Sequence, residues 1–267
     1  HMSQSTFTTQ SSAYALRQSI RRNAHTGSTS GLAEGFVQGN VVILPVEFAN
    51  EFLTYCQLNP VSCPLIAVSE AGQHTMPTLG HDIDMRFDLP EYLMYENGSL
   101  VGSYQDIESF WRLDLVTFVL GCSFSFEHAL TAEGLMPRNI EQGCNVSMFT
   151  TTLPTTTSGR FHGYTVVTMR PYTKENAKRA TQITKRFPNA HGAPIHIGDP
   201  SIIGIADLSQ PDFGDPVLLK EDEVPVFWAC GVTPQLAIKN AKPPICITHA
   251  PGKMLVTDLL DSDLANL

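Results

Sequence analysis

Two cysteines stand at the ends of apolar segments that match each other residue by residue. The segment 118–130 aligns with the segment 226–238 at a constant offset of 108 residues, which places Cys122 opposite Cys230. In both segments an apolar run of strand length leads into a short turn, and a stretch of helical character follows. The pattern therefore predicts two equivalent strand–cysteine–helix turns.

A helix start of this kind can do chemistry. Its unpaired N–H groups and positive dipole end bind a carboxylate, a phosphate or an oxyanion. Ser125 and Thr233 are predicted to be the N-caps, and Ser123 and Gly231 complete the two ligand-binding turns. A cysteine there is expected to have a lowered pKa, and Cys122, with serines around it, is the better candidate nucleophile. The alternative is that both cysteines are small core residues.

Histidines occupy two further loops. The segment 191–200 contains two histidines, two glycines, two prolines and an aspartate, which predicts a shaped loop. His196 is a candidate general acid or base oriented by Asp199, and His191 is a candidate substrate contact. His249 follows another apolar run and is a candidate catalytic residue as well. A purely structural loop is the alternative for the segment 191–200.

Charged residues offer a third kind of site. Arg170 ends an apolar run, where it could hold an anionic substrate or pair with an acid of the protein. Strict polar–apolar alternation over 82–89 predicts a half-buried strand. Its polar face would carry Asp82, Asp84 and Arg86, which could bind an ammonium group or a divalent metal, unless it is simply a solvated face. The chain has no common nucleotide, zinc-protease or hydrolase motif. No cofactor is predicted with certainty, and a divalent metal stays open.

The elements that must position these residues intermix strands and helices along the whole chain, which indicates the α/β class. We expect a main domain, 13–145 and 191–267, with a mixed sheet and helices on both faces. The strand–strand–helix block 146–190 is expected to form a small inserted two-layer α+β subdomain. Residues 1–12 are interpreted as a tag remnant and a flexible N-terminus. Asn97-Gly98 between two apolar runs predicts a β-hairpin.

Composition narrows the class of partner. The chain has 267 residues, of which 42% are hydrophobic and 16% charged, and its formal net charge is −9. Such a chain can bury a core but gains no general attraction from nucleic acid or anionic lipid, so neither is expected as a partner. No apolar run is long enough to span a membrane, and no signal peptide is recognisable. We expect a cytoplasmic protein with reduced thiols that binds a small molecule, and a homo-oligomer is left open.

Several long segments of the sequence resemble a known family. They are 80–86, 120–127, 168–171, 191–200, 226–235 and 247–258. They resemble the bacterial family described as putative hydro-lyases, which in turn resembles a domain of mitochondrial D-glutamate cyclase. The likeness runs from about residue 17 to residue 258. It implies a carbon–oxygen lyase that eliminates water from a small carboxylate or amino acid. More narrowly, it implies the cyclisation of D-glutamate to 5-oxo-D-proline.

The narrower reaction would distribute roles among the candidate residues. It needs a carboxylate anchor, a base for the ammonium group and stabilisation of a tetrahedral oxyanion. The helix starts at 123–125 and 231–233 could supply the anchor and the oxyanion site, His196 or His249 the base, and Arg170 a grip on the second carboxylate.

Other functions fit the same residues. A metal-assisted dehydratase would use the aspartates or the histidines. A racemase or epimerase would use the two cysteines on opposite faces of a Cα. A non-catalytic module would bind an amino acid or a lactam.

Overall fold

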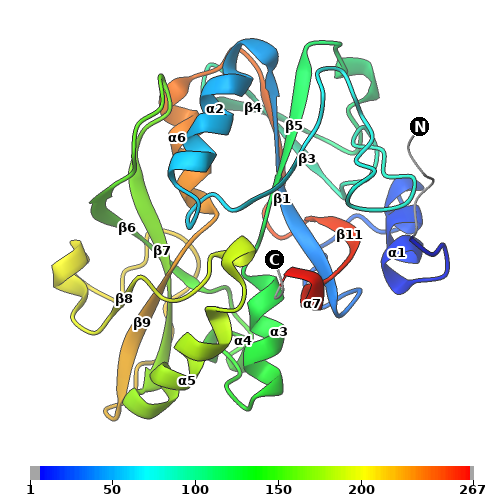
Figure 1. Ribbon diagram of the computed structural model, residues 1–267. Coiled ribbons are helices and arrows are strands. Elements are labelled where there is room, and N and C mark those ends of the chain that lie inside the picture. Colours follow the sequence, from blue (N-terminus) through cyan, green and yellow to red (C-terminus); the bar gives the residue numbers. More distant parts are fainter. Residues whose placement is uncertain (1–6, 265–267) are drawn as a thin grey trace.

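The computed structural model describes residues 7–264 and contains two β-sheets (Figure 1). The larger sheet has the order β2-β5-β1-β10-β3-β4, and β11 also pairs with β1. Its strands are β1 (Phe36–Pro45), β2 (Leu65–Val68), β3 (Tyr92–Glu96), β4 (Ser99–Tyr104), β5 (Leu115–Leu120), β10 (Cys246–His249) and β11 (Leu255–Leu260). The smaller sheet has the order β6-β7-β9-β8, with β6 (Ser147–Pro154), β7 (Tyr164–Thr173), β8 (His196–Ile197) and β9 (Glu223–Ala229).

The α/β class is confirmed, but the expected mixed sheet is wrong. Every strand pair among the described residues is antiparallel. The reason lies in the strand order. β5 and β10 run in the same direction, but they do not pair with each other, because β1 lies between them and is antiparallel to both.

Helices connect the strands. They are α1 (Ser12–Arg21), α2 (Val46–Leu58), α3 (Phe124–Ala132), α4 (Arg138–Glu141), α5 (Lys174–Thr184), α6 (Val232–Ala241) and α7 (Asp261–Leu264), with the 3-10 turns η1 (Glu108–Phe110), η2 (Pro188–Ala190) and η3 (Pro200–Ile203). None of the helices in the described part of the chain is long and apolar enough to cross a membrane.

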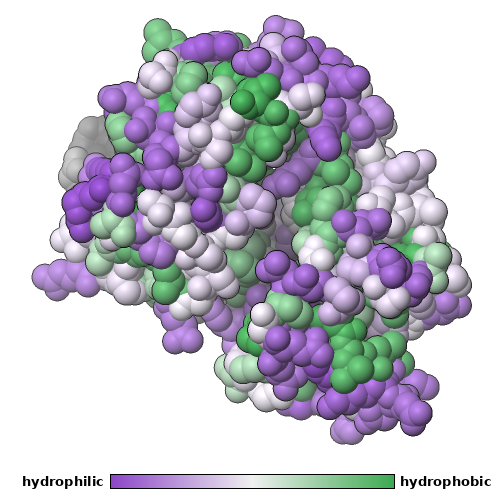
Figure 2. Space-filling model, turned by 180° about the vertical axis from the view of Figure 1, so that it is seen from behind, coloured by the Kyte–Doolittle hydropathy of each residue, from purple (hydrophilic) through white to green (hydrophobic). Residues whose placement is uncertain are grey.

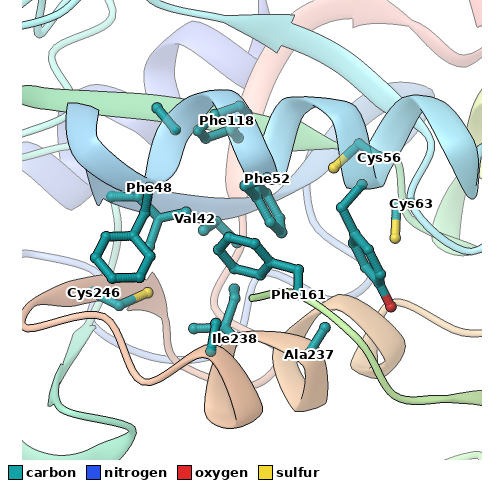
Figure 3. Close-up of a cluster of buried hydrophobic side chains, with 14 of the residues drawn as sticks. Val42, Phe48, Phe52, Cys56, Cys63, Phe118, Phe161, Ala237, Ile238 and Cys246 are labelled. Atoms are coloured by element: carbon teal, nitrogen blue, oxygen red, sulfur yellow. The ribbon is translucent and has the colours of Figure 1, made fainter. Parts of the chain in front are cut away.

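One face of the larger sheet packs against α2 and α6 (Figure 3). Val42 from β1 and Phe118 from β5 point into this cluster, as alternation along a strand requires. Phe52 of α2 lies between two other rings, with centroids 4.9 Å from Phe118 and 5.2 Å from Phe161. Phe161 belongs to the β6–β7 connection, so a loop of the smaller sheet is anchored in the core of the larger one.

The smaller sheet has its own two-sided packing. One face carries Val226 and Trp228 against apolar residues of α3 and α5. The other face carries Phe149, Val167 and Phe227 against the irregular segment that includes η3. This sheet takes β8 and β9 from beyond residue 190, so its strands are not confined to 146–190; the expected domain boundary stays a prediction.

The hairpin at Asn97-Gly98 is confirmed, because β3 and β4 pair and both turn residues have positive φ, 52° and 85°. The strand predicted over 82–89 is wrong, since only the isolated bridge Thr75↔Asp84 is found there. Asp82 has φ 57°, and the amide of Asp84 donates to the Asp88 carboxylate at 2.8 Å. Aspartate side chains thus satisfy amides that a strand would offer to a neighbour.

Candidate functional site

The two cysteine turns adopt the same local structure. Cys122 follows β5 and Cys230 follows β9, and each helix begins two residues later. The amide three residues after each cysteine donates to the cysteine carbonyl, at 3.2 Å for Ser125 and 3.1 Å for Thr233. The amide two residues after donates to the thiol sulfur, at 3.5 Å in the case of Cys230. The duplicated turn inferred from the alignment is therefore present.

The predicted N-caps are wrong by two residues. Ser123 and Gly231 hold the N-cap positions without a capping side-chain bond, and Ser125 and Thr233 lie inside the first turn. Thr233 instead accepts from the amide of Val166 in β7 at 2.9 Å, whereas the buried Ser125 hydroxyl has no hydrogen-bond partner among the residues that the structure describes. Within residues 7–264 no group accepts from the amides of Ser123 and Gly231, so both helix starts keep an open donor.

The thiols have the opposite acidity to the one predicted. The pKa of Cys122 is raised to about 12, mainly by burial and to a smaller extent by the nearby Glu127 and Cys230. Burial likewise raises the pKa of Cys230 to about 11. The turn amides and Arg170 lower both pKa values, but loss of water outweighs them. Both groups are neutral thiols at physiological pH, which argues against a thiolate nucleophile.

Arg170 is the charged centre between the two turns. Its side chain is completely buried and lies 2.6 Å from the carboxylate of Glu127 in α3. It also donates to Thr168 at 2.7 Å and approaches the Ser123 hydroxyl at 3.4 Å. Its guanidinium carbon stands 5.2 Å from the centroid of Trp228 in β9, so residues of both segments surround it. Its Nε has no hydrogen-bond partner in the described chain.

Asn40 and Gly121 bring the turns together. The Asn40 amide group donates to the Gly121 carbonyl at 3.1 Å, and it would lie 3.0 Å from a Cβ at Gly231. A Cβ at Gly121 would lie 1.7 Å from the Asn189 carbonyl oxygen, so only glycine permits this contact. Two helix starts from different sheets, a buried arginine and the segment before His191 thus form one cluster.

His191 and His249 are both buried, and burial lowers the pKa of each to about 4. His191 Nδ1 lies 2.8 Å from the Val61 carbonyl oxygen, and the charge of Arg170 contributes to the lowering of its pKa. His249 Nδ1 lies 3.0 Å from the Val41 amide nitrogen and 3.4 Å from the Val41 carbonyl oxygen, one residue along β1 from Asn40.

The other candidates lie in separate contacts. His196 is on the two-residue strand β8, where Nε2 contacts the Asp199 backbone carbonyl at 2.7 Å. The Asp199 carboxylate accepts from the Ser201 amide instead of the imidazole.

The acidic segment is neutralised by arginines. Asp84 pairs with Arg86 at 2.8 Å, and Asp82 pairs with Arg21 at 3.0 Å. Among the described residues no group of three or more histidine, cysteine or acidic side chains is placed to hold a metal ion.

Seen from behind, the surface is hollowed near the centre of the molecule (Figure 2). Two depressions, of about 420 and 510 Å³, flank α5 and share Lys178 and Gln182. Neither is lined by a residue of the cysteine turns, and lysine and arginine stems form much of their walls. We therefore place the candidate site by its buried polar groups and not by these depressions.

Sequence reasoning missed Glu127 and Asn40. A signal for Glu127 was available, because it aligns with the neutral Gln235 in an otherwise matching pair of turns. The two turns differ in charge at this position, and the turn that has the glutamate is the one that forms the ion pair with Arg170. Asn40 left no comparable signal, since nothing near it in the sequence shows that β1 runs between the two turns.

Comparison with known proteins connects the cluster to one family. The sequence profile of the D-glutamate cyclase family matches residues 116–258, which include both turns, Arg170, His191 and His249. A protein of Aliivibrio fischeri described as "Putative hydro-lyase" is 57% identical over 252 residues, covering 94% of this chain and 95% of its own. A protein of Verminephrobacter eiseniae with the same description is 56% identical over 248 residues, covering 93% and 90%. Another from Bordetella pertussis is 54% identical over 252 residues, covering 94% and 91%.

Proposed function

Because the chain belongs to the D-glutamate cyclase family, whose close relatives are described as hydro-lyases, we propose that it is a hydro-lyase that closes D-glutamate to 5-oxo-D-proline. The observation that carries this proposal is the convergence of two uncapped helix starts on one buried arginine. Such a cluster suits a small dicarboxylate better than a neutral ligand.

The reaction joins the α-nitrogen to the side-chain carboxyl carbon and expels one carboxyl oxygen as water. Negative charge develops on the remaining oxygen in the tetrahedral intermediate. The open amides of Ser123 and Gly231 would donate to a carboxylate oxygen and to this oxyanion. The buried guanidinium of Arg170 would stabilise the same charge without leaving Glu127. The neutral thiols of Cys122 and Cys230 would border the site as weak donors.

The direct test is an assay of the purified protein with D-glutamate, with L-glutamate as the matched control and with Mg²⁺ present or absent. We expect 5-oxo-D-proline, identified by chiral chromatography, from the D-isomer. The Arg170→Lys variant keeps the charge but loses the planar fork, and should be slower by 10-fold or more. Absence of product from both isomers under all conditions would remove the proposal.

One observation favours a second candidate, a two-cysteine racemase or epimerase. The two sulfurs are close enough that Cys230 raises the pKa of Cys122. Such an enzyme uses one cysteine as a thiolate to remove a proton from one face of a Cα and the other as a thiol to return one to the opposite face, and the raised pKa values of both thiols weigh against it. Incubation with glutamate in D₂O separates the candidates, because only the racemase incorporates deuterium at Cα without forming the lactam.

A further inference from the structure

The segment around η2 presses directly on the Cys122 turn. Asn189 and Ala190 approach Gly121 so closely that a Cβ there would lie 1.7 Å from the Asn189 oxygen and 3.4 Å from the Ala190 Cα. The next residue is His191, which is 2% exposed. The charge of Arg170 also contributes to the lowered pKa of its imidazole. The fold thus brings one histidine to the edge of the cluster.

The tautomer of His191 follows from its one hydrogen bond. Nδ1 lies 2.8 Å from the Val61 carbonyl oxygen, and a carbonyl only accepts, so Nδ1 carries the proton. Nε2 is then left with a free lone pair. No residue within 7–264 is hydrogen-bonded to that nitrogen.

The loop that fixes this tautomer also fixes the turn. Within residues 59–64, Val61 accepts from His191 and Pro64 accepts from the Gly121 amide at 2.7 Å. One short loop therefore holds the His191 imidazole and the Cys122 turn in fixed positions relative to each other.

The other two candidate histidines, His249 and His196, lie in different surroundings. His249 Nδ1 lies 3.0 Å from the Val41 amide nitrogen and 3.4 Å from the Val41 carbonyl oxygen, so these contacts fit either tautomer, and no charged group acts on the pKa of its imidazole. His196 contacts a carbonyl through Nε2 and lies on the edge strand β8. A base needs an unprotonated nitrogen close to the reacting group, and His191 has one next to the segment that packs on the Cys122 turn.

The backbone of His191 is strained. Its φ is 78°, in the left-handed region that only a few per cent of non-glycine residues adopt, histidine more often than most. The Gly192 amide, which donates to Phe187 at 2.9 Å, and the Val61 contact hold it there. Strain of this kind persists where the surrounding structure over-determines a residue, and it clusters at active sites.

Resting on the proposed function, we propose that His191 is the general base of the cyclisation. The carboxylates of the bound substrate raise the pKa of the imidazole from its value in the free protein, Nε2 accepts a proton from the substrate ammonium, and the freed amine attacks the side-chain carboxyl carbon. The imidazolium then gives its proton to the departing oxygen. In the whole reaction two protons move from nitrogen to that oxygen, which leaves as water. The balance needs no oxidant, reductant or further reactant.

The substitution His191→Asn isolates this role. Asparagine tolerates the positive φ, and its amide nitrogen can replace Nδ1 as donor to Val61, but it offers no base. We expect a protein of unchanged circular dichroism and closely similar Tm whose turnover of D-glutamate falls by roughly 100-fold or more. The matched control is His162→Asn, because His162 is exposed and lies in a loop. This variant should keep full turnover. More than half of the wild-type turnover in His191→Asn would overturn the proposal.

A second measurement does not depend on turnover, and so separates this proposal from the proposed function. In protein labelled with ¹⁵N-histidine at pH 7, we expect His191 to show a protonated Nδ1 and an unprotonated Nε2. Saturation with 5-oxo-D-proline should shift the Nε2 resonance. Observation of the Nε2–H tautomer would exclude the base role even if the wild-type protein makes 5-oxo-D-proline. If the protein forms no product and Nε2 does not respond to the lactam, both proposals fall.

Discussion

Arg170 carries a positive charge in a position without exposed surface, and Glu127 is its only ionic partner in the described chain. Removal of one member of a buried pair leaves the other charge unsolvated. We expect Arg170→Met to lower the free energy of unfolding by about 3 to 5 kcal/mol, measured by urea denaturation. Adding Glu127→Gln should recover part of this loss. If the double variant is no more stable than the single one, the ion pair is not the cause.

A surface pair supplies the matched control. Arg112 and Asp114 lie 2.7 Å apart with side chains 47% and 42% exposed. Arg112→Met should change stability by less than about 1 kcal/mol, because water screens an exposed pair.

The cysteines should differ in reactivity according to burial. Cys122 and Cys230 are buried thiols with pKa values raised to about 12 and about 11, whereas Cys144 is half-buried. Alkylation by iodoacetamide at pH 7.5, followed by peptide mass spectrometry, should label Cys144 first. Labelling should reach Cys122 and Cys230 only after unfolding in urea. Rapid labelling of Cys122 in the native protein would restore the thiolate nucleophile as a candidate.

At the scale of elements, the site depends on how closely η2 packs on the start of α3. Gly121 does not have positive φ, so a Gly121→Ala change acts only through the contact with Asn189. We expect this variant to lose most activity and to be less stable by about 1 to 3 kcal/mol, since it overpacks a buried contact. Gly27→Ala, where a Cβ meets nothing nearer than 3.9 Å, should behave as the wild type. Equal activity of the two variants would show that the contact does not position the site.

Some of these elements could be predicted from the sequence and others could not. The cysteine turns were predictable because strand, turn and helix signals are local and occurred twice. The prediction of a strand over 82–89 was wrong because the polar–apolar alternation of this segment is that of a strand, although the chain turns there. In the structure its aspartates accept from backbone amides nearby, as the Asp88 carboxylate does from the Asp84 amide. The N-caps were misplaced because a hydroxyl can serve a neighbouring strand, as Thr233 does with Val166. The acidity of the thiols could not be read, since burial depends on the whole fold.

Pairings across long stretches of chain were equally invisible. His191 meets Val61, which is 130 residues away, and no local pattern records that contact. Glu127 of α3 meets Arg170 of β7 across 43 residues. The members of the site could be proposed from residue type, but their grouping required the structure.

For the whole molecule, we expect two buried histidines to lower the free energy of unfolding as the pH falls. The pKa values of His191 and His249 are about 4 in the folded state, below the ordinary value of about 6.5. Their contribution is fully present above pH 6.5 and is lost as the pH falls toward 4, because only the unfolded chain binds the protons. The loss should approach about 3 kcal/mol for each histidine. His128, whose pKa Asp261 raises, acts in the opposite direction.

Urea denaturation between pH 7 and pH 4 measures this dependence. The His249→Asn variant should show a shallower decline than the wild type, because one of the two proton-binding groups is gone. An unchanged slope would mean that His249 is not buried in its neutral form.

The central strand of the larger sheet has a consequence for the synthesis of the protein. β1 ends at residue 45, but two of its three neighbours, β10 and β11, lie between residues 246 and 260. At the usual pace of translation, a finished β1 waits roughly 10 to 40 s for these partners. During that interval a run of valine, isoleucine and leucine has an unpaired edge on the ribosome. We therefore expect the nascent chain to be a client of holding chaperones, and the cluster around Arg170 to assemble only in the last moments of translation.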